Sequence, residues 1–207
     1  MDLNSILSFL GVAILLTVMP GPDILFVMAQ SMSQNSKAGI TTALGLCTGL
    51  VVHITAATVG ISALIYQSAI AFAIVKYAGA AYLLFLAWQA FHEKETDVSF
   101  EQQEPKMSNK LFRKGVLMNL LNPKVSLFFL ALLPQFVHHE TGYVPVQMLL
   151  LGLLFLVQAF IVFSLVSIFS YKVKALLLNK PVIMGRINIV KGVLLAMIGL
   201  QIALSEK

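Results

Sequence analysis

The sequence predicts an all-α membrane protein that crosses the bilayer about six times. The 207-residue chain is 58% hydrophobic and only 11% charged, whereas soluble domains carry about 25% charged residues. Its mean hydropathy is +0.89. The charges are also clustered, and residues 38–75 contain none. A single helix of that length would run about 57 Å, nearly twice the ~30 Å hydrocarbon core, so this stretch must contain two spans.

Six apolar runs predict six spans, in two groups of three. They cover about 5–28, 39–65, 69–91, 115–137, 145–171 and 187–204. The one long polar connection lies between the third and fourth runs. We therefore divide the chain into a first three-helix unit (1–91), a cytoplasmic linker (92–112) and a second three-helix unit (113–207). The lysine and arginine count places the linker in the cytoplasm and both termini outside. Five spans plus a re-entrant first segment, with the N-terminus inside, remain an alternative.

The two units resemble one another in sequence. Pro22-Asp23 matches Pro123-Lys124 at an offset of 101 residues, and Leu44-Gly45-Leu46 matches Leu151-Gly152-Leu153 at an offset of 107. An odd number of spans per unit turns the second copy upside down in the bilayer. The prediction is therefore an inverted repeat, with the helices broken at the proline motifs.

Each of the two matching spans contains a charged break. The first break is Pro20, Gly21, Pro22 and Asp23, and the second is Asn122, Pro123 and Lys124. A charge at membrane depth costs at least about 2.5–3.5 kcal/mol and needs protein or water around it. Proline removes a backbone donor and frees a carbonyl about one turn earlier. Such backbone persists in a membrane only where it is buried in protein or lines a wet cavity.

These breaks predict a pocket for an α-amino acid near the bilayer midplane. Helices restarting after each break point their N-terminal amides at a carboxylate, and Lys124 strengthens that preference. Asp23, the freed carbonyls, Asn119 and Asn122 suit an ammonium group or a proton. The alternative is that Asp23 and Lys124 simply pair with each other and hold the two units together.

His53 continues a stripe of small residues in the second span. Gly45, Gly49 and His53 recur every four residues, which predicts close helix packing on this face. His53 is a candidate proton relay, since its unperturbed pKa is about 6.5. Its alternative role is a hydrogen bond across a helix interface. The two glycines could pack helices within one chain or between the subunits of a homodimer.

Several motifs together resemble the LysE/RhtB family of amino-acid exporters. They are Pro20-Gly21-Pro22, Asn122-Pro123-Lys124, Leu127-Phe128-Phe129 and Pro134-Gln135-Phe136. The resemblance implies efflux of homoserine, threonine, leucine or a basic amino acid through a bacterial cytoplasmic membrane, driven by a proton or other ion gradient. It points to the three residues of each proline motif as functional. We favour neutral cargo, because Asp23 is the only acid within the apolar spans.

Other classes of protein are less well supported by the sequence. An enzyme would need a nucleophile, a metal or paired acids at depth, and the spans offer only Cys47, His53 and Asp23. No Walker-type phosphate loop is present, so we expect no cofactor. His138-His139-Glu140 lacks metal-ligand spacing, so we expect no metal site. The net charge of +5 is explained by membrane orientation and contact with lipid rather than by nucleic acid. A metal-ion exporter and a membrane-embedded enzyme remain the alternatives.

Overall fold

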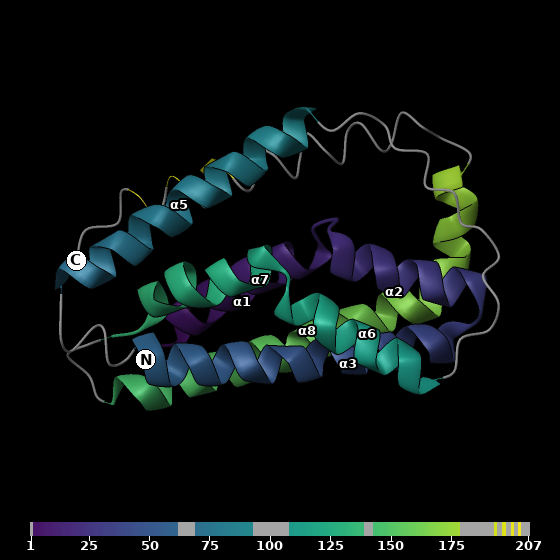
Figure 1. Cartoon of the computed structure of the whole chain (residues 1–207), viewed down its shortest axis with the longest axis horizontal. Coiled ribbons are helices and arrows are strands. Elements are labelled where there is room, and N and C mark those ends of the chain that lie inside the picture. Colours follow the sequence, from purple (N-terminus) through teal and green to yellow (C-terminus); the bar gives the residue numbers. More distant parts are fainter. Residues whose placement is uncertain are drawn as a thin grey trace.

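The protein is a bundle of helices (Figure 1). The computed structural model describes residues 2–61, 69–92, 108–138 and 143–178, together with five single positions between 193 and 203. Within these residues the regular elements are all helical and no strand occurs. The predicted all-α class is confirmed.

The first predicted span is a pair of helices joined by a bend. Helix α1 covers Leu3–Val18 and α2 covers Pro22–Ser33, and their axes differ by 56°. Asp2 caps α1, its carboxylate accepting the backbone N–H of Ser5. The hydrogen bonds from Ser5 lower the pKa of this exposed carboxyl, and His138 adds a smaller contribution. The break predicted from the prolines is therefore present, and α2 runs five residues beyond the predicted span end at 28.

The next two elements follow the predicted second and third spans. Helix α3 covers Ser36–Ala56 after an Asn35 cap, and it continues as a π-helical turn, η1, over Ala57–Ile61. Helix α5 covers Ala69–His92. The hairpin that we expected between these spans lies outside the described residues.

A second bent arrangement of helices follows from residue 108 onward. Its elements are α6 (Ser108–Leu120), α7 (Pro123–Leu127), the π-helical η2 (Phe128–Leu132), the 3₁₀-helical η3 (Leu133–Phe136) and α8 (Val144–Leu178). A bend of 48° separates α6 from the segment that begins at Pro123. Helix α8 extends seven residues beyond the predicted end at 171. The sixth predicted span, 187–204, falls almost wholly outside the described residues.

The helices have the length and composition of membrane spans. Within the described residues, two helices (36–60 and 144–170) are long and apolar enough to cross a bilayer alone, and there are four such spans if each bent pair counts as one. Helix α8 also exposes a stripe of large apolar side chains: Leu149, Leu150, Leu153, Val157, Ile161, Leu165 and Ile168. A contiguous exposed stripe of this kind is stable against lipid rather than water.

Glycines bring α3 and α6 into close contact (Figure 1). A Cβ at Gly49 would lie 2.8 Å from the side chain of Asn119, and one at Gly115 would lie 2.6 Å from the carbonyl oxygen of Thr42. A Cβ at Gly45 would collide with the backbone of Phe112. This glycine face of α3 therefore packs against α6 of the same chain. A homodimer stays a prediction, and its interface would have to use another face.

We expect Gly45→Ala to destabilise the protein by about 1–3 kcal/mol, because the added methyl group must push the backbone of α6 away. Thermal unfolding in detergent measures this effect. Gly11→Ala is the matched control, since a Cβ at this helical glycine meets no atom within 4 Å. Equal melting temperatures for the two variants would contradict the close packing of α3 on α6.

Candidate functional site

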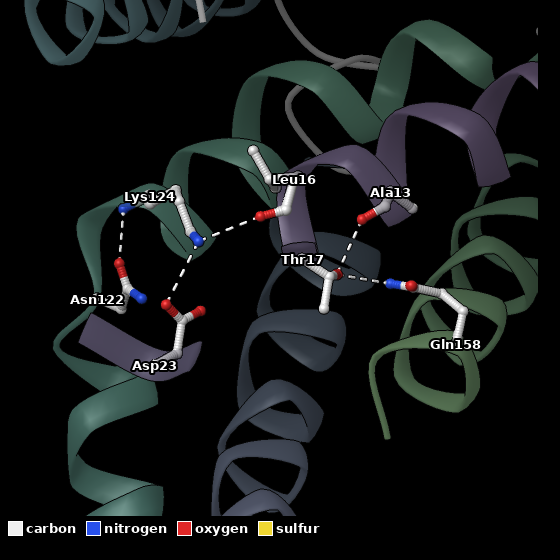
Figure 2. Close-up of polar contacts among 7 residues, drawn as sticks. All are labelled: Ala13, Leu16, Thr17, Asp23, Asn122, Lys124 and Gln158. Carbon is white, nitrogen blue, oxygen red and sulfur yellow. Dashed lines mark hydrogen bonds and ion pairs between the residues drawn. The ribbon is translucent and has the colours of Figure 1, made fainter. Parts of the chain in front are cut away.

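The two breaks bring opposite charges into contact inside the protein (Figure 2). The Nζ atom of Lys124 lies 3.3 Å from Oδ1 of Asp23. Both residues are buried, with 8% and 3% of their surfaces exposed. Buried ions require a partner, because removing a charge from water costs several kcal/mol. The predicted convergence of Asp23 and Lys124 is confirmed.

The same local sequence pattern places both charges. Gly21 and Asn122 are the N-caps of α2 and α7, and a proline occupies the first helical position after each cap. Proline suits that position because the N–H it lacks would have no helical partner there. In both helices this proline is exposed, whereas the following charged residue is buried. Each break thus turns its charge toward the interior.

A carbonyl freed by proline completes the surroundings of Lys124 (Figure 2). In a regular helix the carbonyl of Leu16 would accept the N–H of residue 20. Residue 20 is proline and has no N–H. Nζ of Lys124 donates to the Leu16 carbonyl instead, at 3.2 Å. The ammonium group therefore bridges the end of α1 and the beginning of α2.

Gly21 permits this close arrangement. A Cβ at position 21 would lie 2.9 Å from Oδ1 of Asp23 and 3.1 Å from Nζ of Lys124. Any larger residue would press on both charged groups. The glycine is therefore needed for the space around the ion pair.

The expectation that the side chain of Asn122 would accept a hydrogen bond from an ammonium group is wrong. Its Oδ1 accepts the backbone N–H of Lys124 at 3.1 Å and so caps α7. Its Nδ2 is buried and has no hydrogen-bond partner among the residues that the structure describes. Since the unpaired atom is a donor, Asn122 can serve an anion and not a cation. The cap fixes this orientation of the amide.

Asn119 and His53 meet behind the second break. The carbonyl of Asn119 would normally bond to residue 123, which is proline. It accepts the backbone N–H of Asn122 at 3.0 Å and Nε2–H of His53 at 3.1 Å. Oδ1 of Asn119 is buried, and no atom in the described part of the chain hydrogen-bonds to it. His53 thus makes the predicted hydrogen bond across a helix interface. Its ring also stacks on that of Phe129, with the two ring centroids 6.1 Å apart.

An aromatic cluster lies between α1, η2, η3 and α8. It consists of Phe9, Phe128, Phe129, Phe136 and Phe155, whose contacting rings have centroids 4.7–5.9 Å apart. Next to it, Nε2 of Gln158 donates to Oγ1 of Thr17 at 2.9 Å and joins α8 to the last turn of α1. These contacts fix the end of α1, from which the Leu16 carbonyl points to Lys124 (Figure 2).

The structure brings some of the predicted residues together and separates others. Lys124 contacts Asp23, and Gly21 and Asn122 lie next to this pair. Asn119 lies at the end of α6, where its carbonyl contacts His53 of α3. Leu16, whose carbonyl contacts Lys124, was not among the site residues that we predicted from the sequence. Its position four residues before Pro20 identifies it as a residue whose carbonyl loses its helical N–H partner to proline. Among the described residues, no three His, Cys, Asp or Glu side chains are placed to hold a metal ion.

The comparison with protein families agrees with this arrangement. The model of the LysE type translocator matches residues 6–206. The chain belongs to the LysE family. It is therefore a transporter of small molecules rather than an enzyme, and a membrane protein with several spans. The resemblance inferred from the proline motifs is confirmed.

Similar proteins occur in several bacteria. A membrane protein of Vibrio cholerae is 30% identical over 210 residues, which is all of both chains. The membrane protein YrhP of Bacillus subtilis is 32% identical over 83% of this chain and 86% of its own. A homoserine/homoserine lactone efflux protein of Salmonella typhimurium is 29% identical over 95% of this chain and 94% of its own. No solved structure matches.

We expect Asp23→Asn and Lys124→Met each to destabilise this LysE-family protein by about 3–5 kcal/mol, because each leaves a buried charge without its partner. The double variant should lose much less than the sum of the two. A double-mutant cycle from denaturant unfolding in micelles measures the coupling.

The exposed pair of Asp2 and His138 is the control for this cycle. Nε2 of His138 and Oδ1 of Asp2 are also 3.3 Å apart, but the Asp2 side chain is 61% exposed. Asp2→Asn should therefore have little effect on stability. Additive losses at Asp23 and Lys124 would contradict an ion pair that stabilises the fold.

Proposed function

We propose that this protein exports a small zwitterionic amino acid of the homoserine, threonine or leucine kind from the bacterial cytoplasm, coupled to an ion gradient. One observation carries the proposal. A buried carboxylate, a buried ammonium group and an unpaired amide donor lie together where two helices are broken. Membrane transporters commonly bind substrate between such broken helices.

The charges in the site match the two ends of an amino acid. Lys124 and the unpaired Nδ2 of Asn122 are donors for the carboxylate of the substrate. Asp23 is the acceptor for its ammonium group. In the absence of substrate, Asp23 and Lys124 compensate one another. A zwitterion can take over both partners without leaving either charge alone, and an uncompensated ion would be costly at this depth.

The relatives in Salmonella narrow the choice of test substrates. Their names give homoserine and homoserine lactone as exported compounds. Homoserine carries both an ammonium group and a carboxylate, whereas in the lactone the carboxylate has become part of a ring ester. The two compounds therefore separate the part played by Asp23 from that played by Lys124.

The prediction is made for counterflow in proteoliposomes with labelled homoserine and labelled lactone. Asp23→Asn should slow both compounds by about 10–100-fold, which corresponds to a lost hydrogen bond between charged groups. Lys124→Gln should slow homoserine by a similar factor and the lactone far less. Thr55→Val is the control, because this exposed hydroxyl donates to the Val51 carbonyl of its own helix and makes no other hydrogen bond within the described residues. Equal uptake by liposomes with and without the protein would reject the assignment.

The internal repeat belongs to the same proposal. We propose that 1–91 and 113–207 are inverted copies joined by 92–112. The contacts support this, because each unit packs one long helix against the broken helix of the other unit. Helix α3 lies on α6, and α8 lies on α1 and α2. A pocket between inverted copies can open alternately to the two sides of a membrane.

His53 is the candidate proton relay of this mechanism. His53→Gln keeps an N–H donor for the Asn119 carbonyl but cannot carry a proton at neutral pH. We expect this variant to retain counterflow and to lose accumulation driven by a pH gradient. His53→Leu, which also removes the donor, should in addition be less stable. Gradient-driven export by His53→Gln at the wild-type rate would restrict His53 to its hydrogen bond across the helix interface.

A further inference from the structure

The oxygen atoms around the ammonium group of Lys124 form a site of their own (Figure 2). We propose that the Leu16 carbonyl and the Asp23 carboxylate form a binding site for a primary ammonium ion. Lys124 fills this site as a tethered occupant, and the ammonium group of the substrate displaces it. The displacement step rests on the proposed function, whereas the cation site does not.

The fold leaves the Leu16 carbonyl and the Asp23 carboxylate in need of a positively charged donor. The Leu16 carbonyl cannot accept an N–H from residue 20, which is proline. Asp23 is fixed in the first turn of α2 and is 97% buried, with 3% of its surface exposed. A lone carbonyl and a lone carboxylate at such depth each cost free energy unless a donor compensates them. One positive donor between them satisfies both.

The two contacts of Lys124 are longer than typical hydrogen bonds between charged groups. Nζ of Lys124 lies 3.2 Å from the Leu16 oxygen and 3.3 Å from the Asp23 oxygen. Hydrogen bonds between charged partners are typically about 2.7–2.9 Å long, so neither contact is at its optimum. The lysine stem is flexible and its ammonium group is a compact charge. Lys124 can therefore leave the site without a change in the helix that carries it.

The space around Nζ selects for a small ion. The Cα of Gly21 stands so near that even a methyl group there would lie 3.1 Å from Nζ. A primary ammonium ion presents three N–H donors in the volume that Nζ occupies. A quaternary ammonium ion is larger and has no N–H to donate, so we expect the site to exclude it.

Exchange with substrate keeps the charges balanced. The ammonium group of an amino acid enters between Leu16 and Asp23, and the released Lys124 meets the carboxylate of the same molecule. Asn122 offers its unpaired Nδ2 beside the backbone of Lys124. No covalent bond changes, and no charge remains alone at any stage.

The test uses Lys124→Met in detergent. Methionine replaces the lysine stem up to its ε-carbon and lacks only the ammonium group. Ammonium and methylammonium chloride should raise the melting temperature of this variant by about 3–6 °C at ten times their Kd. Tetramethylammonium and sodium chloride at the same concentrations should not. The wild type, whose site is filled, and Asp23→Asn/Lys124→Met, whose carboxylate is gone, should not respond to ammonium.

Each other outcome overturns the proposal. Equal stabilisation by tetramethylammonium or by sodium, or an equal response of the double variant, would mean that the effect is not ammonium binding at Asp23. No response to any cation would mean that a free ion cannot replace Lys124. Lys124→Ala leaves more space at the site than Lys124→Met. If neither of these variants folds in any of the salts while the double variant folds, a free ion also cannot replace Lys124. Because no amino acid is present, a protein that fails in counterflow can still pass this test.

Discussion

The structure depends on how two carbonyl groups, each of which loses its regular helical N–H partner to a proline, are hydrogen-bonded inside the protein. Leu16 lies four residues before Pro20, and Asn119 lies four residues before Pro123. Each carbonyl accepts a hydrogen bond from a side chain on a distant helix, Lys124 in the first case and His53 in the second. The Asn119 carbonyl also accepts the backbone N–H of Asn122. Unpaired backbone groups cost several kcal/mol in lipid. Lys124 therefore joins the two broken helices by supplying the donor that the Leu16 carbonyl lacks, and His53 ties the second broken helix to α3.

The two reciprocal hydrogen bonds are not equivalent, and this difference separates support from binding. His53 bonds to Asn119 behind a tight helix contact at Gly49, and its ring lies on the buried Phe129. Lys124 makes longer contacts and is bounded by a glycine on one side. An unpaired donor on Asn122 lies beside it. The first arrangement holds two helices together, whereas the second places an unpaired amide donor beside two buried charges.

The sequence predicts much of this arrangement through local rules. Matching offsets of Pro22-Asp23 and Pro123-Lys124 predicted that the charges meet, and the missing proline N–H predicted freed carbonyls. The role of Asn122 could not be predicted in the same way. Its amide can face either direction, and the cap on Lys124 decides which end stays free. The partner chosen by each freed carbonyl depends on packing between distant segments, such as Gly115 against Thr42. Local spacing carries no information about such contacts.

In the mechanism that we propose, the ammonium group of Lys124 also keeps the buried carboxylate of Asp23 paired when no substrate is bound. Withdrawal of Lys124 alone would leave the Asp23 carboxylate and the Leu16 carbonyl without a donor, and a buried ion stripped of its partner costs about 3–5 kcal/mol. A compound with an ammonium group and a carboxylate removes that cost, because it supplies one partner to Asp23 and another to Lys124. On this mechanism, selectivity for amino acids follows from the need to keep both charges paired. The shape of the side chain then has only a secondary part in the choice of cargo.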